Sequence, residues 1–401
     1  MASTANPTGG RGPTRVFELL VAAIAAGTVI GLIALWPGDV DAPVSEGLAA
    51  ETERAEVISV TYEACPPPQT GECGEAEIRL DTGPESGATS TLISGGTGIE
   101  PELEPGDEIR VARTEPAPVG PPTSGESEAA SQGRTTYTLA DFERRGPMLW
   151  LALAFAALVI LFGRLRGALS LVGLAISLVV ILAFVVPAIL DGSAPLAVAI
   201  VGALAVMLCT VTLAHGWGPK SLAAMLGTAV SLVLVAVLAL AFTNLTHLTG
   251  LSSEEATLLL QGGADISLEG LLLAGIVIAA LGVLDDVTVS QASTVLALRA
   301  ANPAQSFRQL YGNALRVGRD HVSATVNTLV LAYVGASLPV LLIFSSGEIG
   351  VIDAVNTELI ATEVVGTLVG SIGLIAAVPV TTALAALLAR DVPRTAVRHR
   401  G

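Results

Sequence analysis

The sequence predicts an all-α polytopic membrane protein with about eight transmembrane helices and a small β domain outside the membrane. Of its 401 residues, 52% are hydrophobic and only 14% are charged, which is too apolar for a water-soluble domain of this length. Eight uncharged runs are long enough, or nearly so, to cross a hydrocarbon core that requires about 20 residues per helix. They cover residues 19–36, 147–163, 167–190, 195–215, 222–242, 270–284, 322–344 and 364–389. These runs are continuously apolar, whereas a lipid-facing strand alternates, so helices are expected.

The basic residues predict that both chain ends lie in the cytoplasm, because short cytoplasmic loops are rich in Lys and Arg. Arg11 and Arg15 precede the first run, Arg164 and Arg166 follow the second, and Lys220 follows the fourth. The three loops then assigned to the outside, residues 191–194, 243–269 and 345–363, contain no Lys or Arg. If the first run were instead a cleaved signal peptide, seven spans would remain with the same orientation.

The charge distribution predicts the domain layout. Residues 39–145 carry 22 acidic and 7 basic side chains, a net charge of −15 out of −16 for the whole chain. We expect a disordered cytoplasmic tail over 1–16, a first transmembrane helix over 17–36, an acidic extracytoplasmic domain over 37–146, a seven-helix membrane domain over 147–390 and a basic cytoplasmic tail over 391–401. The acidic domain disfavours nucleic acid as a partner.

The outer domain has the alternating pattern of β-strands. Residues 55–62, 77–80, 90–94, 108–112 and 135–142 alternate apolar with polar side chains between Gly and Pro turns. Five short strands favour a small barrel of the OB-like type, with a flexible Pro/Gly/Ser-rich insert near 114–134. Cys65 and Cys73 flank a short loop, where a disulfide is expected in an oxidising compartment.

The sixth run is too short to span the membrane without including charge. Only 15 uncharged residues separate Glu269 from Asp285, so a span of about 20 residues must include Asp285 and Asp286. Neighbouring helical residues point about 100° apart, so the two carboxylates are expected to have different roles. Charged groups within spans usually line a cavity, a proton path or an ion site. In the alternative, the pair ends the span, caps a separate amphipathic helix and is solvated.

Other polar residues are predicted at a similar depth. Thr288, Gln291 and Asn327 are the expected neighbours of the aspartate pair, and oxygen atoms in one layer suit a cation or a proton relay. Asn302 and Pro303 are predicted to start an elbow helix whose arginines contact lipid phosphates.

Among three classes of function, the sequence favours a transporter or permease-like protein with its site around Asp285 and Asp286. A non-catalytic accessory or sensor, whose outer domain binds an envelope protein, is the alternative. No enzyme is expected, because no serine–histidine set is visible and adjacent aspartates on one helix cannot face each other as a protease dyad. No nucleotide-binding motif is present, and no catalytic residue, cofactor or metal is predicted.

Three stretches resemble a known family. They are GVLDDVTVSQASTVLALRAANP at 282–303, GRDHVSATVNTLVLAYVGASLPVLLIF at 318–344 and ELIATEVVGTLVGSIGLIAAVPVTT at 358–382. Here the chain resembles the YibE/F-like family of bacterial multipass membrane proteins, over most of its length from the first span to the last. The resemblance implies location in the bacterial plasma (inner) membrane. It also implies an aspartate after a glycine-rich stretch, a place that Asp285 or Asp286 occupies, but it assigns no functional residue.

Overall fold

The computed structural model describes residues 12–38, 52–64, 72–95, 101–114, 136–252, 254–261, 266–347 and 350–389. The chain forms two compact units, Met1–Ala42 with Leu158–Gly401, and Pro43–Ala157. Several predictions fall outside the described part of the chain. They concern both predicted tails, apart from residues 12–16, and nearly all of the predicted insert. The predicted disulfide also falls outside it, because Cys65 and the side chain of Cys73 are not described.

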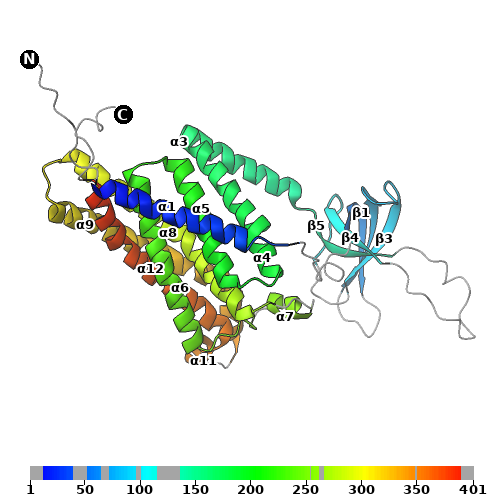
Figure 1. The fold of residues 1–401 in the computed structure, drawn as a ribbon. Helices are drawn as coiled ribbons and strands as arrows, with labels where there is room; N and C mark the ends of the chain where they lie inside the picture. Colours follow the sequence, from blue (N-terminus) through cyan, green and yellow to red (C-terminus); the bar gives the residue numbers. More distant parts are fainter. Residues whose placement is uncertain are drawn as a thin grey trace, which may run out of the picture. The chain divides into compact units, whose positions relative to one another are not determined.

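The elements follow one another in an order that separates strands from most helices (Figure 1). They are α1 (Gly12–Ala34), β1 (Thr52–Ala64), β2 (Glu72–Leu80), β3 (Thr89–Gly95), β4 (Glu108–Thr114), β5 (Thr136–Phe142), α3 (Arg145–Val180), the π-helix η1 (Ile181–Val185), α4 (Val186–Leu190), α5 (Pro195–His215), α6 (Pro219–Leu245), α7 (Glu254–Gln261), α8 (Leu268–Ala301), α9 (Phe307–Ala336), α10 (Leu338–Ser346), α11 (Val351–Val355) and α12 (Glu358–Leu388).

The five strands close into a barrel in the order β1-β2-β3-β5-β4. All pairs are antiparallel except β3 with β5, and β1 closes the barrel by pairing with both β2 and β4. Each predicted strand is confirmed, as is the small barrel, because period-2 alternation places one side chain in two on the inside. The resulting core contains Ala55, Val57, Ala76, Ile78, Leu80, Leu92, Leu103, Ile109, Val111 and Tyr137.

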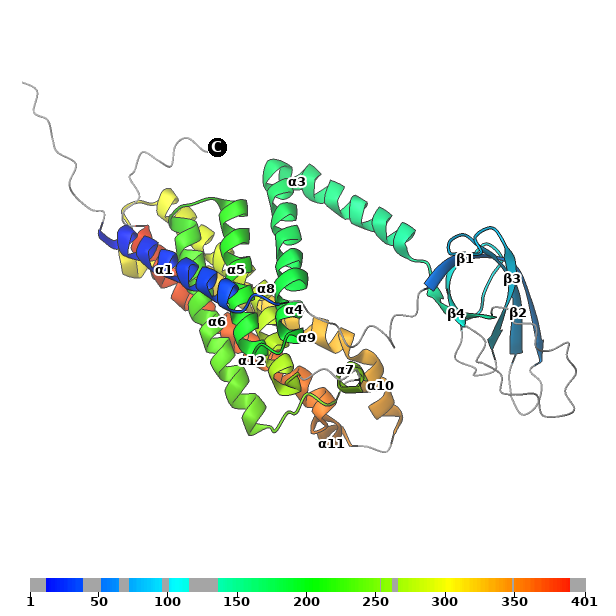
Figure 2. The ribbon, with the colours of Figure 1, turned by 45° about the vertical axis from the view of Figure 1, so that its right-hand side comes forward.

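The membrane unit consists of long apolar helices, which confirms the helical membrane class. In the described part of the chain, six helices meet the length and apolarity needed for a span, or seven when α9 and α10 (Figure 2) count as one span bent by 62°. In the core, α6, α8 and α12 pack against one another. Glycines allow this close approach: a Cβ added at Gly373 of α12 would lie 2.2 Å from Cγ2 of Val235 on α6.

The difference between this number and the predicted eight lies mainly in α3. The second and third predicted spans form one helical run, Arg145–Leu190, that counts as a single candidate span. A straight helix of 46 residues would be about 69 Å long, more than twice a hydrocarbon core of about 30 Å. Arg164, however, has non-helical backbone angles (φ 51°, ψ −132°) that divide α3 in two. The eight-span topology and its sidedness remain predictions.

The ends of α8 and α9 differ from the predicted boundaries. Helix α8 continues without interruption through Asp285 and Asp286 to Ala301, so no separate helix starts at the pair, against the alternative considered above. The prediction of an N-cap at Asn302 was wrong, because Asn302 ends α8 and Ser306 caps α9 in a capping box with Gln309. The Ser306 and Gln309 side chains satisfy two free backbone donors at once, whereas Oδ1 of Asn302 accepts from the backbone N–H of Ala304 in the turn between the helices.

Candidate functional site

The membrane unit contains a cavity of about 520 Å³ between α3, α5 and α8, here called the Asp285 cavity. Its walls are largely aliphatic, and its polar groups come from all three helices. The lining residues are Ser170, Gly173, Leu174, Ser177, Ile181, Val185, Gly202, Ala203, Val206, Thr210, Val211, Ala214, His215, Ile278, Leu281, Gly282, Asp285, Asp286 and Val289. An apolar cavity with a few convergent polar groups is typical of small-molecule sites.

Asp285 is the carboxylate that faces this cavity. Its Oδ2 lies 3.2 Å from Oγ1 of Thr210 on α5, and that hydroxyl also lies 2.9 Å from the backbone oxygen of Val206. Its Oδ1 is buried and has no hydrogen-bond partner among the described residues. A buried carboxylate oxygen without a donor is costly, so this atom is the candidate acceptor for a ligand donor or a proton.

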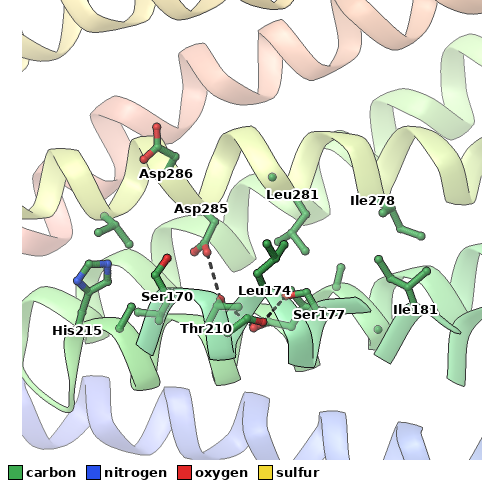
Figure 3. A pocket seen from close by; sticks show the side chains of 18 of the residues that line it. Ser170, Leu174, Ser177, Ile181, Thr210, His215, Ile278, Leu281, Asp285 and Asp286 are labelled. Carbon is green, nitrogen blue, oxygen red and sulfur yellow. Dashed lines mark hydrogen bonds between the residues drawn. The ribbon is translucent and has the colours of Figure 1, made fainter. Parts of the chain in front are cut away.

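The two aspartates point in different directions. In Figure 3, Asp285 points toward Thr210, whereas Asp286 lies on the other side of α8. Asp286 is exposed in the membrane unit and still contributes to the cavity lining. This geometry is what the 100° step between adjacent helical residues requires, and it makes Asp285 the candidate for direct ligand contact.

The cavity has a polar end and an apolar end. His215, Ser170 and the aspartates gather toward one end in Figure 3, while Ile181 and Ile278 lie toward the other. Ser177, between the two ends, donates to the backbone oxygen of Gly173 at 2.9 Å. A ligand in this cavity would therefore meet hydrogen-bonding groups at one end and hydrocarbon at the other.

The π-helix η1 shapes the apolar end. The backbone N–H of Val186 donates to the oxygen of Ile181, five residues earlier. Pro187 follows directly and lacks an N–H, and its ring would crowd the carbonyl four residues before it, which favours a widened turn. Val185 then packs so closely against α5 that a Cβ at Gly202 would lie 2.6 Å from its Cγ2.

Two of the predicted neighbours lie in a separate interior polar layer between α6, α8 and α12. Thr288 is fully buried, and its Oγ1 lies 2.7 Å from Oγ1 of Thr228 on α6. The same hydroxyl donates to the backbone oxygen of Asp285 at 3.1 Å. Thr288 is thus joined to the backbone of Asp285 but does not line the cavity.

Gln291 is 3% exposed and connects three helices in this layer. Its Nε2 lies 3.0 Å from the backbone oxygen of Ala314 on α9 and 2.7 Å from Oγ1 of Thr382 on α12. Asn327, the last of the five candidates, is exposed on α9 and lines none of the described cavities. The structure therefore brings Asp285 and Asp286 to one cavity, places Thr288 and Gln291 behind it and leaves Asn327 apart.

The sequence reasoning missed Ser170, Ser177 and Thr210. Each is a single hydroxyl residue within an apolar run, a pattern that is also common where helices simply pack together. The pairing of Thr210 with Asp285 depends on how α5 and α8 are rotated against each other, which no local pattern states. Among the described residues, no group of three or more His, Cys, Asp or Glu side chains is placed to hold a metal ion.

Comparison with known families assigns this membrane unit. A family model described as "YibE/F-like protein" matches residues 151–391, which is more than half of the chain. The chain belongs to the YibE/F-like family. No curated protein and no solved structure matches it.

The family match includes every residue that lines the Asp285 cavity and the whole interior polar layer. The match begins after β5, so the barrel and α1 lie outside it. It therefore covers less of the chain than the resemblance from the first span to the last that was expected from the sequence. This YibE/F-like chain is a membrane protein, and its candidate site lies wholly within the part that defines the family.

Proposed function

We propose that this YibE/F-like protein is a transporter or permease-like protein of the bacterial plasma membrane, and that the Asp285 cavity is its substrate or coupling-ion site. The observation that carries the proposal is Asp285, which lines a cavity of about 520 Å³ and whose buried Oδ1 has no hydrogen-bond partner among the described residues. Ionisable residues inside spans are costly and usually serve transport, proton relay or ion binding. An enzyme is not proposed.

The helix geometry around the cavity supports movement. The helical run of residues 145–190 forms one wall of the cavity. It is interrupted at Arg164, before its first cavity residue, and at η1, which contains its last two, Ile181 and Val185. Irregular helix segments are tolerated within membranes where they line a cavity, and π-turns are frequent at functional sites. The half-helix of residues 165–180 can therefore shift relative to α5 and α8, as alternating access requires.

The experiment compares cells that express the wild-type chain, Asp285→Asn or Asp320→Asn, with untargeted mass spectrometry of cell extract and medium. Asp320 is exposed on α9 and does not line the cavity. The wild-type and Asp320→Asn chains are expected to change the distribution of the same compounds between cell and medium, and Asp285→Asn to abolish that change. Identical distributions for wild type and Asp285→Asn, at equal membrane expression, would remove the proposal.

A second candidate function is an envelope-binding accessory or sensor, favoured by the barrel. Its strand order, with β1 between β2 and β4 and β3 parallel to β5, supports an OB-like form, whose ligands bind across strands 2 and 3. A polar groove of about 300 Å³ lies on that face, lined by Ser59, Thr61, Glu75, Glu77, Thr89, Ser90 and Thr91.

A photo-cross-linking residue in place of Thr91 tests this second function. It is expected to capture an envelope component in intact cells, and Glu77→Lys is expected to prevent that capture. Absence of any adduct counts against this role.

A further inference from the structure

We infer that the Asp285 cavity binds a small organic cation, namely an amine or quaternary ammonium compound with an apolar body. The inference deepens the proposed function, on which it rests, by naming a substrate class. Three properties of the cavity carry it: its charge, the free carboxylate oxygen and the aliphatic wall.

The charge of the lining favours cations. The ionisable lining residues are Asp285, Asp286 and His215, and no Lys or Arg lines the cavity. Lys220 is not among the lining residues, and its Nζ lies 3.2 Å from Nδ1 of His215. The lining therefore offers negative charge and no fixed positive charge, which repels an anion from a low-dielectric site.

The carboxylate is arranged to receive one donor group. Oδ2 of Asp285 shares the single Thr210 proton with the backbone oxygen of Val206, and Oδ1 has no donor among the described residues. A ligand ammonium would satisfy both oxygens and neutralise the charge. An inorganic divalent cation is a poorer match, because Ca²⁺ requires six to eight oxygen ligands and no cluster of three acidic, His or Cys side chains occurs in the described residues.

The aliphatic wall indicates that the ligand has more than a charged head. Leu174, Ile181, Val206, Ile278 and Leu281 face the cavity, and its volume of about 520 Å³ falls within the range of about 300–1,000 Å³ typical of small-molecule pockets. A bare proton or hydrated metal ion would leave this wall unused. An amine with a phenyl or alkyl body would cover it, with the nitrogen at Asp285 and the body toward Ile181.

The test uses three probes with a phenylalkyl body and different heads: 4-phenylbutylamine, 4-phenylbutanol and 4-phenylbutyrate. Binding of each is measured calorimetrically to the full-length chain in lipid nanodiscs, for wild type, Asp285→Asn and Asp320→Asn. Asp320→Asn is the matched control, because it makes the same chemical change at an exposed residue of α9 that does not line the cavity.

The amine is expected to bind wild type and Asp320→Asn at least about tenfold more tightly than the alcohol, as a charge-assisted hydrogen bond implies. In Asp285→Asn the preference disappears while the alcohol binds as before, which also shows that the cavity is still folded. Equal binding of all three probes to wild type, tighter binding of the butyrate, or an equal loss in Asp320→Asn overturns the inference.

A proton-flux measurement in proteoliposomes separates this inference from the proposed function. Asp285-dependent proton flux without an amine preference would overturn the substrate class and leave transport in place. Amine binding that requires Asp285, in a chain that leaves the compound distribution of cells unchanged, would support the ligand class and contradict transport.

Discussion

Oγ1 of Thr210 on α5 lies 3.2 Å from Oδ2 of Asp285 on α8. The shortness of the sixth apolar run predicted Asp285 as a site residue, whereas nothing in the sequence predicted Thr210 as its partner. Thr210 shares its one proton with a backbone oxygen, which makes it a positioning residue for Asp285. The contact holds the Asp285 side chain toward α5, while Asp286 points to the other side of α8 (Figure 3).

Replacing Thr210 by Val, which preserves the shape and removes the hydroxyl, is expected to weaken binding of 4-phenylbutylamine by up to about tenfold. Thr210→Ser should restore most of the affinity. Ser177→Ala is the matched control, because that hydroxyl also lines the cavity but bonds within its own helix. Calorimetry of the nanodisc-embedded chain measures the effect, and unchanged affinity in Thr210→Val would show that the contact does not position the carboxylate.

Gln291 is predicted to be a stability residue. Gln291→Leu removes two buried hydrogen bonds, one to the backbone oxygen of Ala314 and one to Oγ1 of Thr382, at a cost of about 1–3 kcal/mol in the free energy of unfolding. Asn327→Leu, on the exposed side of α9, should change it by about 0.5 kcal/mol at most. Thermal unfolding of the purified chain in detergent compares the two, and equal melting temperatures would contradict the role of the interior polar layer.

The close approach of α6 to α12 depends on Gly227. A Cβ at this position would lie 2.0 Å from Oγ1 of Thr381, so Gly227→Ala must push the helices apart or move Thr381 and should lower the yield of folded protein. Thr381→Ala removes the clashing atom, whose hydroxyl has no partner among the described residues, and should restore part of that yield. Gly275→Ala, where nothing lies within 4 Å, should be neutral or stabilising. Size-exclusion profiles of wild type, Gly227→Ala, the double variant with Thr381→Ala, and Gly275→Ala decide, and tolerance of Gly227→Ala alone would disprove the contact.

The sequence predicted the features that depend on length and period. Strand alternation identified all five strands of the barrel, and the short sixth run required Asp285 and Asp286 to lie within a span. It did not predict contacts that depend on the rotation of one helix against another. Depth alone grouped Asn327 with Gln291, yet Asn327 is exposed and Gln291 is buried, because depth does not determine which side of a helix faces its neighbours. The start of α9 was also predicted at the wrong residue. The sequence has helix-start signals at Asn302–Pro303 and at Ser306–Gln309, and only the second pair forms the capping box.

The barrel is expected to lose stability in acid through Glu143. The backbone N–H of Arg145, 3.0 Å from its Oε1, and the guanidinium of Arg110, 3.1 Å from its Oε2, hold the pKa of Glu143 below its usual value. Because the pKa of Glu143 is lower in the folded state, its ionised carboxylate stabilises the barrel at pH values above the unfolded-state pKa of about 4.3. This stabilisation is lost as the pH falls through the pKa of the folded state. Amide exchange in β4 and β5, corrected for its intrinsic pH dependence, should therefore accelerate in acid for wild type and much less for Glu143→Gln. Glu77→Gln, an exposed carboxylate on β2, should behave as wild type, and the same acid response in Glu143→Gln would contradict the assignment.

Pro187 gives a test of cavity shape that is independent of charge. Pro187→Ala restores a backbone N–H next to η1 and permits an ordinary α-turn, which would move Ile181 and Val185 relative to α5. Because these side chains meet the ligand body rather than its head, affinity for the amine and for the alcohol should fall together, by about threefold or more, with their ratio unchanged. Pro379→Ala in α12, at a proline that does not line the cavity, is the control. A changed ratio would mean that η1 acts on Asp285, and unchanged affinities would mean that the π-turn does not shape the apolar end.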